Sequence, residues 1–419
     1  MNQIRTIKGT HDVLPEKSKD WQRLEKIIHK NASLFGYNEI RTPIIEEAGL
    51  FNRGIGGNTD IVSKEMYSWV DRDNTTIALR PEMTASVVRS FIQHSLGSQS
   101  SLQRLYYMGP SFRRERPQKG RQRQFHQFGV EAIGSNNPEQ DAEVIALGWE
   151  ILSKAGISNL ELKLSSIGSE DCRNKYRSEL VNFFKPYKSK LSKISQQRLI
   201  DNPLRILDTK NKDEIDIIKS SPKIEEFYTK EDHAHFKQVQ DYLKAIEIPF
   251  SLDPLLVRGL DYYTQTTFEI ISNDIGAQDA LLGGGRYDGL IKSLGGKDTP
   301  AVGFAAGMER ILLAISTNKD IEKTTPTIYI VCVEKDALGS VQRIAKDLRN
   351  LGYNVLLETM RRSMKAQMRE ANRCGADFAV IVGEQENNEK TVQVKNLNDG
   401  NQETIDQKNL FNHFKSLTF

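Results

Sequence analysis

Strand-like segments crowd the first part of the chain and leave little room for helices between them. Five such segments, rich in β-branched, aromatic and other apolar residues, occur at residues 66–70, 75–79, 102–109, 124–134 and 160–166. The stretch "DRDN" between the first two has the composition of a hairpin turn. Strands that follow one another with so few intervening helices pair mostly with their chain neighbours, so we expect a largely antiparallel sheet.

Helical sequence flanks and interrupts these strands. Residues 15–35 place apolar side chains at a helical spacing between Pro15 and Gly36, which predicts an amphipathic helix. From about residue 171 to residue 246 the sequence is charged, helical and poor in strands, so we expect a helical insertion there. Strand character returns in "LLVRGLDYYTQTTFEII", followed by a Gly-rich turn and a helix in "GMERILLAIS".

A second domain is predicted after a polar linker at residues 317–326. Beyond it, strands alternate with helices that end at Gly352 and Gly375, as in a compact α/β domain. The expected fold class is therefore mixed, α/β (α+β). An antiparallel-sheet domain occupies residues 1–324, with the helical insertion at about 171–246, and an α/β domain occupies residues 325–419.

Composition restricts the class of protein. The 419 residues carry 58 Lys and Arg against 55 Asp and Glu, a net charge of +3, so nucleic-acid binding has to be argued from local clusters. Three widely spaced cysteines predict neither a disulfide framework nor a zinc site. The N-terminus lacks a signal-peptide core, and no apolar run reaches the roughly 18 residues of a membrane span. We expect a soluble cytoplasmic protein.

A basic hairpin tip, "RRERPQKGRQRQ" at residues 113–124, leads into a strand with two different faces. Side chains alternate across a strand, so Phe125, Gln127, Gly129 and Glu131 share one face while the opposite face is mostly apolar. An amide and a carboxylate on either side of a glycine suit a small ligand that approaches the backbone. A solvent-facing strand with ordinary polar residues would give the same spacing.

Arginine and acidic residues recur near this strand. By the same alternation, Arg113 projects from the preceding strand toward the same ligand, as a planar cation suited to a carboxylate or phosphate. In "ALRPEMTASVVRSF", Pro81 fits a first helical turn that contains Glu82 and Thr84. Glu82 either complements the helix dipole or binds an ammonium group.

Further candidates lie in the later strands. Arg258 stands in an apolar neighbourhood before the pair Tyr262 and Tyr263, which suggests an anionic partner, internal or bound. "LLGGGRYDGL" matches no phosphate-binding loop and predicts only a tight turn near a ligand. Arg310 follows small residues in a helix and reads, taken alone, as a surface arginine.

Signals for metal and nucleophilic catalysis are absent from the sequence. It contains no H-E-x-x-H and no G-x-S-x-G motif, and we expect no metal site. His233 and His235 in "DHAHF" are expected to be solvent-facing. Arginines, carboxylates, tyrosines and glycines remain, the inventory of a site that works by positioning and by stabilising charge on phosphates.

Five segments in order carry a resemblance: "KGTHDVLP", "LRPEMT", "MGPSFRRERPQKGRQRQFHQFGVEAIG", "LVRGLDYYTQTTFEI" and "AVGFAAGMERILLAI". They resemble the signatures of the bacterial-type histidyl-tRNA synthetases. The segment around "RTPIIEEAGLF" resembles the first class II synthetase motif, residues 113–131 the second and the Arg310 helix the third. The resemblance implies a class II catalytic domain with a helical insertion, and a C-terminal anticodon-binding domain.

The resemblance also implies an activity. Histidine and ATP would form histidyl adenylate and pyrophosphate, and the histidyl group would then pass to the terminal adenosine of tRNA(His). The implied catalytic residues are Arg113 and Arg258. The implied histidine-binding residues are Glu82, Met83, Thr84, Arg113, Gln127, Glu131, Arg258, Tyr262, Tyr263 and Tyr287. Met83 is a departure, because a glycine is commoner there and methionine would crowd the amino-group site.

The remaining implied contacts concern ATP and tRNA. ATP-binding residues would be Arg113, Glu115, Arg121, Phe125 and Arg310, with the adenine between Phe125 and Arg310. The tRNA-binding residues of the hairpin tip would be Arg116, Gln118, Lys119 and Arg123. Mg²⁺ is expected with ATP as its substrate complex. The first class II motif implies a homodimer.

Two other functions are consistent with parts of the sequence. A catalytically silent relative could serve as a regulatory subunit of histidine biosynthesis, but such relatives characteristically lack the anticodon-binding domain and often the equivalent of Arg258. A plain nucleic-acid-binding protein would use the basic tip alone. That function leaves the face of Gln127 and Glu131 and the tyrosine pair unexplained.

Overall fold

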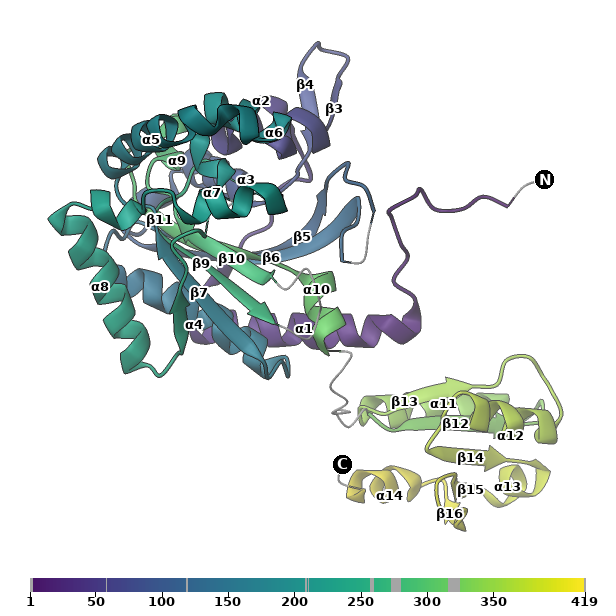
Figure 1. Cartoon of the computed structure of the whole chain (residues 1–419). Helices are drawn as coiled ribbons and strands as arrows, with labels where there is room; N and C mark the ends of the chain where they lie inside the picture. The colour runs from purple at the N-terminus through teal and green to yellow at the C-terminus, as the bar shows by residue number, and fades with distance from the viewer. Residues whose placement is uncertain are drawn as a thin grey trace. The chain divides into compact units, whose positions relative to one another are not determined.

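The computed structural model of the chain contains two compact units, Met1–Lys319 and Asp320–Phe419. The structure describes residues 3–57, 59–117, 120–207, 209, 211–256, 260–272, 280–315 and 325–417. Most of the expected linker therefore lies outside the described residues. Each unit has a hydrophobic core of its own and is described separately (Figure 1).

An eight-stranded sheet forms the centre of the first unit. In spatial order it contains β1 (Asn38–Glu39), β5 (Gln103–Phe112), β6 (Gln124–Ile133), β11 (Ala301–Gly307), β10 (Ala280–Arg286), β9 (Thr264–Ser272), β7 (Leu160–Ser166) and β8 (Phe250–Leu252). All pairings are antiparallel except β1 with β5 and β7 with β8. The largely antiparallel sheet that the sequence predicted is confirmed.

Helices bury one face of this sheet. They are α1 (Pro15–Leu34), α4 (Pro138–Lys154), α8 (Lys230–Ala245) and α10 (Met308–Ile315). Their apolar residues, such as Leu24, Ile145 and Leu243, share a core with Phe128 and Val130 of β6. Helix α1 begins at Pro15 and ends just before Gly36, whose φ of 76° is left-handed, so the predicted helix is confirmed.

The expected helical insertion divides into two parts. Helices α5 (Glu170–Phe184), α6 (Lys193–Asp201) and α7 (Ile215–Lys219) enclose a separate core around Tyr176 and Phe184. Helix α8 instead packs against α4, and its Val239 lies in the main core (Figure 1). The sequence could not show this division, because both parts are similarly charged and helical.

The tight turn expected within "LLGGGRYDGL" is present at Asp288 and Gly289, but it does not include the run of three glycines. Residues 283–285 lie inside β10, a central strand between β9 and β11. A Cβ on Gly284 would lie 2.2 Å from the carbonyl oxygen of Gly303, so the glycines let neighbouring strands approach closely. The strand β11 in "AVGFAAG" was also not predicted, and Tyr262 and Tyr263 precede β9 rather than lying in it.

A small three-stranded sheet lies beside the main one. It contains β2 (Ile45–Glu47), β4 (Thr76–Leu79) and β3 (Tyr67–Val70), with β4 in the centre. The predicted turn joins β3 and β4, with the residue Asn74 at a φ of 67°. Ala78 of β4 packs against Phe51 of α2 (Ala48–Phe51), so the centre of one face of this sheet is buried.

The second unit is the expected α/β domain. Its sheet contains, in order, β13 (Asn354–Leu357), β12 (Thr327–Cys332), β14 (Phe378–Val382), β15 (Thr391–Asn396) and β16 (Gln402–Asp406). Its helices are α11 (Leu338–Asn350), α12 (Met364–Arg373), α13 (Glu384–Glu389) and α14 (Leu410–Ser416). Apolar residues of α11 and α14 pack on one face and those of α12 on the other.

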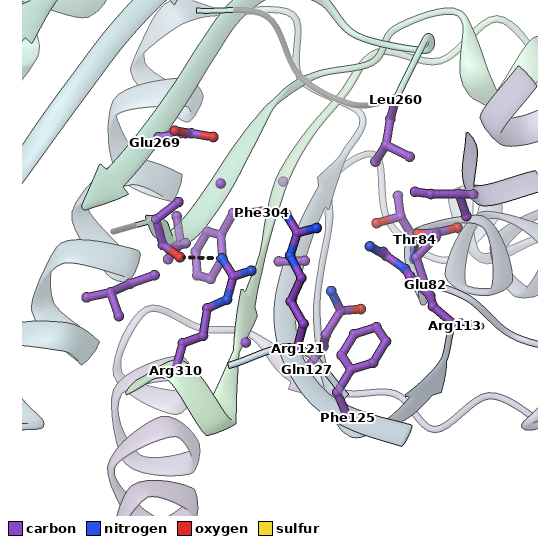
Figure 2. Close-up of a pocket in the computed structure, with 18 of the residues that line it drawn as sticks. Glu82, Thr84, Arg113, Arg121, Phe125, Gln127, Leu260, Glu269, Phe304 and Arg310 are labelled. Atoms are coloured by element: carbon purple, nitrogen blue, oxygen red, sulfur yellow. Dashed lines mark hydrogen bonds between the residues drawn. The ribbon is translucent and has the colours of Figure 1, made fainter. Parts of the chain in front are cut away.

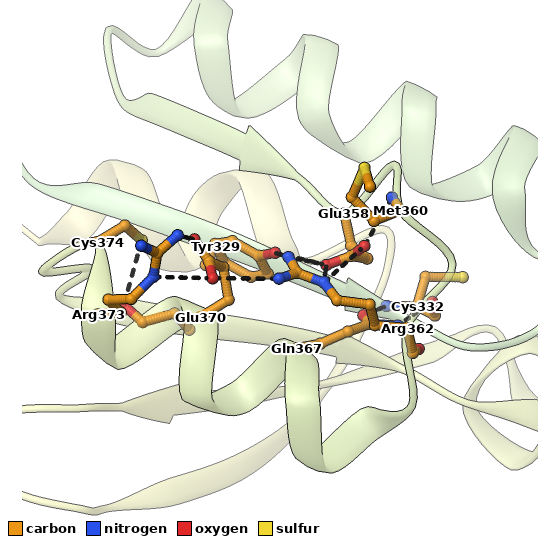
Figure 3. A network of polar contacts seen from close by, with 10 residues as sticks. Tyr329, Cys332, Glu358, Met360, Arg362, Gln367, Glu370, Arg373 and Cys374 are labelled. Atoms are coloured by element: carbon orange, nitrogen blue, oxygen red, sulfur yellow. Dashed lines mark hydrogen bonds and ion pairs between the residues drawn. The ribbon is translucent and has the colours of Figure 1, made fainter.

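A polar network ties the loop after β13 to this sheet (Figure 3). Arg362 pairs with Glu358 at 2.7 Å and with Glu370 at 3.1 Å, and the Tyr329 hydroxyl donates to Glu358 at 2.8 Å. Gln367 bonds both the N–H and the carbonyl of Cys332.

Within the described parts of the chain, no helix combines the length and apolarity that crossing a membrane requires.

Candidate active site

A cavity of about 410 Å³ lies on the face of the main sheet opposite its helices (Figure 2). Gln127 and Glu131 of β6 line it, while Phe128 and Val130 point into the helix-covered core. The alternation predicted for this strand is therefore present in the structure. The volume falls within the range of small-molecule sites.

Glu131 lies at the closed end of the cavity, almost fully buried. Its Oε1 accepts hydrogen bonds from Thr84 Oγ1 at 2.8 Å and from the Tyr107 hydroxyl at 3.0 Å. Its Oε2 accepts from the Tyr287 hydroxyl. Burial raises the pKa of Glu131 to about 8, although the three hydroxyl donors favour the charged form.

Gly129 has a different role from the one expected. A Cβ at this position would lie 2.3 Å from the Tyr107 hydroxyl oxygen and 2.5 Å from the carbonyl oxygen of Phe304. Gly129 pairs directly with Tyr107 across β5 and β6. The glycine therefore admits the tyrosine side chain rather than a ligand.

Glu82 lies just before helix α3 (Thr84–Gln93), not within its first turn as expected. Its two carboxylate oxygens accept the N–H groups of Thr84 at 2.6 Å and Ala85 at 2.9 Å. The bond to the helix N-terminus is favourable for a carboxylate, yet burial raises the pKa of Glu82. Met83 packs beside Leu105 in a hydrophobic cluster, away from the residues that line the cavity.

Arg113 lies at the root of the basic hairpin. Its Nε donates to the carbonyl of Pro81 at 2.9 Å, and its guanidinium carbon lies 5.2 Å from the centre of the Phe125 ring. Burial lowers the pKa of Arg113, but an arginine stays charged in proteins. Nearby, Arg121 Nη1 lies 3.3 Å from Glu115 Oε2.

Arg310 marks the other side of the cavity (Figure 2). Its Nη1 donates to the carbonyl of Ala280 at 2.9 Å, and burial lowers its pKa. It is therefore not the surface arginine that its sequence suggested. The preceding Glu309 accepts the backbone N–H of His126 at 2.9 and 3.0 Å, which fixes the start of α10 against β6.

Three tyrosines cluster at the closed end. The ring centres of Tyr262 and Tyr263 lie 4.8 Å apart, and those of Tyr262 and Tyr287 lie 5.6 Å apart. All three line the cavity. Arg258, the other expected catalytic arginine, lies outside the described residues.

The hairpin tip is only partly described. Arg116 is exposed, while Gln118 and Lys119 lie outside the described residues. Arg123 is not free in the tip: its N–H donates to the carbonyl of Gly9 at 2.7 Å and its side chain packs on that glycine. The hairpin therefore contains both an exposed arginine, Arg116, and an arginine held against the N-terminal segment, Arg123.

Sequence reasoning missed two buried arginines that hold the site. Arg80 donates to the carbonyls of Pro110 at 2.8 Å and Thr42 at 2.9 Å, joining β5 to the segment before β2. Arg286 Nε lies 2.8 Å from Asp141 Oδ1. His235, expected to face solvent, lies 2.8 Å from the other oxygen of Asp141. Only the tertiary structure brings these partners together.

The antiparallel sheet with its arginine-lined and carboxylate-lined cavity is the architecture of a class II aminoacyl-tRNA synthetase. A family model described as histidyl-tRNA synthetase matches residues 9–311, and one described as an anticodon binding domain matches residues 327–417. The chain belongs to the histidyl-tRNA synthetase family.

Individual relatives align with this chain over nearly the whole length of both chains. A histidine–tRNA ligase from Rippkaea orientalis is 46% identical over 417 residues, which cover 100% of this chain and 97% of the relative. One from Halothermothrix orenii is 44% identical, with 99% of each chain covered. The crystal structure of apo histidyl-tRNA synthetase from S. aureus has a TM-score of 0.84 at 36% identity, covering 99% of this chain and 100% of that one.

Proposed function

We propose that the chain is a histidine–tRNA ligase. A carboxylate oxygen of histidine attacks the α-phosphorus of ATP, pyrophosphate leaves, and a hydroxyl of the terminal adenosine of tRNA(His) then displaces AMP from the histidyl group. The observation that carries this proposal is that one cavity is lined both by buried carboxylates and hydroxyls and by arginines, with Arg113 beside Glu82 and Arg310 on the opposite side (Figure 2). The reaction belongs in the cytoplasm, where its tRNA is used.

The closed end suits the amino acid. Glu82, Thr84 and Gln127 would hold the α-amino group, and Glu131 and Tyr263 the imidazole nitrogens. Tyr262 and Tyr287 complete the pocket wall. An apolar analogue would leave a buried carboxylate and hydroxyls unpaired, and such a site can discriminate by roughly 10⁴-fold without editing.

The arginines that line the cavity suit ATP. Arg113, with Arg258, would neutralise the α-phosphate as its charge spreads in the transition state. Phe125 and Arg310 would enclose the adenine, with Arg310 stacked on it as a cation. Mg²⁺ would arrive bound to the ATP phosphates, and the carboxylates of Glu115 and Glu269 that line the cavity are oxygen donors of the kind this ion accepts.

The tRNA would contact both units. The exposed Arg116, with Gln118 and Lys119, would meet the end of the acceptor stem, whereas the anchored Arg123 would set the base of the tip. The second unit would bind the anticodon. Its loop after β13 contains the exposed Arg361 and follows the carboxyl end of a parallel strand, the edge at which α/β sheets bind ligands.

A homodimer is favoured by the three-stranded sheet. Its register places Ile45, Leu79 and Tyr67 in one row and Glu47, Ile77 and Trp69 in the next, all on the face away from the buried Ala78. Ile45 is 50% exposed and Trp69 is 42% exposed. A mostly apolar sheet face left in solvent is typical of an interface, and β2 of this face belongs to the segment that resembles the first class II motif.

Histidine-dependent exchange of labelled pyrophosphate into ATP tests the proposed reaction. Exchange that requires both histidine and the intact chain is the expected result. Histidine binding without exchange would support the regulatory-subunit alternative instead. RNA binding without histidine binding and without pyrophosphate exchange would support a plain nucleic-acid-binding protein.

A further inference from the structure

Tyr107 touches the proposed imidazole-binding carboxylate without belonging to the expected histidine-binding set. It is fully buried on β5, and its hydroxyl lies 3.0 Å from Glu131 Oε1 and 3.4 Å from Thr84 Oγ1. Its ring crosses Gly129, where a Cβ would lie 2.5 Å from the ring carbon that bears the hydroxyl. The strand pairing and this glycine together fix the hydroxyl beside Glu131.

Glu131 depends on such donors. Among the described residues, its hydrogen-bond donors are three hydroxyl groups: those of Thr84 in α3, Tyr107 in β5 and Tyr287 after β10. Glu82 is a second carboxylate nearby, whose charge opposes ionisation of Glu131. Neutral hydroxyl groups therefore fix the orientation of this carboxylate and partly offset the effect of burial on its proton affinity.

We propose that Tyr107 is a positioning residue that orients the Glu131 carboxylate for the imidazole of histidine. The inference rests on the proposed function, since it deepens the role given there to Glu131. Tyr107 acts on histidine through Glu131, so its hydroxyl contributes to histidine recognition and leaves ATP recognition unchanged. Loss of a hydrogen bond to a charged group corresponds to about a tenfold weaker interaction.

Tyr107→Phe tests this proposal because it removes the hydroxyl and keeps the ring over Gly129. The matched control is Tyr106→Phe. Tyr106 is also buried on β5, but it points to the other side of the strand, where its hydroxyl lies 2.8 Å from His29 Nδ1. In pyrophosphate exchange, Tyr107→Phe should raise the KM for histidine about tenfold, with the KM for ATP within twofold of wild type.

The pH profile separates positioning from general damage. The Tyr107 hydroxyl bond favours the charged form of Glu131, so its loss raises the pKa of that carboxyl further. The Glu131 inflection in kcat/KM for histidine should move to higher pH in Tyr107→Phe and stay in place in Tyr106→Phe. Site-specific 3,5-difluorotyrosine at position 107, a stronger donor, should move it to lower pH and provides the test if the phenylalanine variant does not fold.

Three outcomes decide the matter. An unchanged histidine KM and inflection in Tyr107→Phe, while Glu131→Gln still weakens histidine, would overturn the role of Tyr107 alone. Equal effects of Tyr107→Phe and Tyr106→Phe would also overturn it. A Glu131→Gln variant with unchanged histidine KM would instead contradict the proposed function of the pocket, and the role of Tyr107 would fall with it.

Discussion

Arg286 and Asp141 form an ion pair of 2.8 Å between two fully buried side chains. The pair joins β10 to α4, and Arg286 also donates to the carbonyls of Ser135 at 3.0 Å and Asn137 at 3.1 Å. Its chain neighbour is Tyr287, which donates to Glu131. The pair therefore supports the position of Tyr287, which lines the proposed histidine pocket.

Asp141→Asn should destabilise the first unit by about 3 kcal/mol, because it removes one of the two carboxylates that pair with the buried Arg286 and leaves it with Asp288 at 3.1 Å. The matched control is Asp298→Asn, which breaks the exposed ion pair of Asp298 with Lys292 and should cost about 0.5 kcal/mol or less. Thermal or urea unfolding of both variants measures the difference. Equal losses of unfolding free energy in the two variants would show that the buried ion pair stabilises the first unit no more than the exposed one.

Arg113→Ala should lower the rate of adenylate formation roughly 100-fold, because one preorganised donor to the α-phosphate is typically worth about 3 kcal/mol. Arg116→Ala is the control within the same hairpin, since Arg116 is exposed. It should leave pyrophosphate exchange within twofold of wild type and slow the transfer of histidine to tRNA. Loss of exchange in both variants would argue against a hairpin divided between ATP and tRNA.

Local patterns predicted part of the site well. The alternation of β6 needs only the period of two along a strand, so the sequence separated Gln127 and Glu131 from the core residues of the other face. Helix α1 was predictable because a proline and a glycine mark its ends. The order of the motifs then indicated the family.

Features that depend on neighbouring strands were not predictable. Residues 283–285 resembled a turn because glycine commonly breaks structure, but in β10 they make room for the adjacent strands. The sequence predicted that Gly129 makes room for a ligand, but the strand register pairs it with Tyr107, whose side chain occupies that space. His235 contacts Asp141, which lies 94 positions earlier in the chain, and no local sequence pattern predicts a contact over that separation.

Glu131 should make the stability of the unliganded protein fall as the pH rises. Its pKa in the folded protein is about 8, against an ordinary value of 4.5, so folding favours the protonated carboxyl. The contribution is fully present below pH 4.5 and is lost as the pH rises toward 8, by about 1.4 kcal/mol for each unit between the two values. Glu131→Gln, which stays neutral, should gain stability relative to wild type between pH 5 and pH 8.5, as thermal unfolding at several pH values would measure. A constant difference would show that Glu131 is ionised throughout.

Trp69→Glu should dissociate the proposed dimer, because it replaces a large apolar side chain with a second carboxylate in the row of Glu47, and burying that charge in an interface is costly. Trp69 shares its sheet face with Ile77 and Ile45, whereas Ser68 is exposed on the opposite face of the same strand. Ser68→Glu is therefore the control and should remain dimeric. Sedimentation velocity at micromolar concentration distinguishes the two variants. A Trp69→Glu dimer, or a wild-type chain that is monomeric and fully active, would remove this face from the proposed interface.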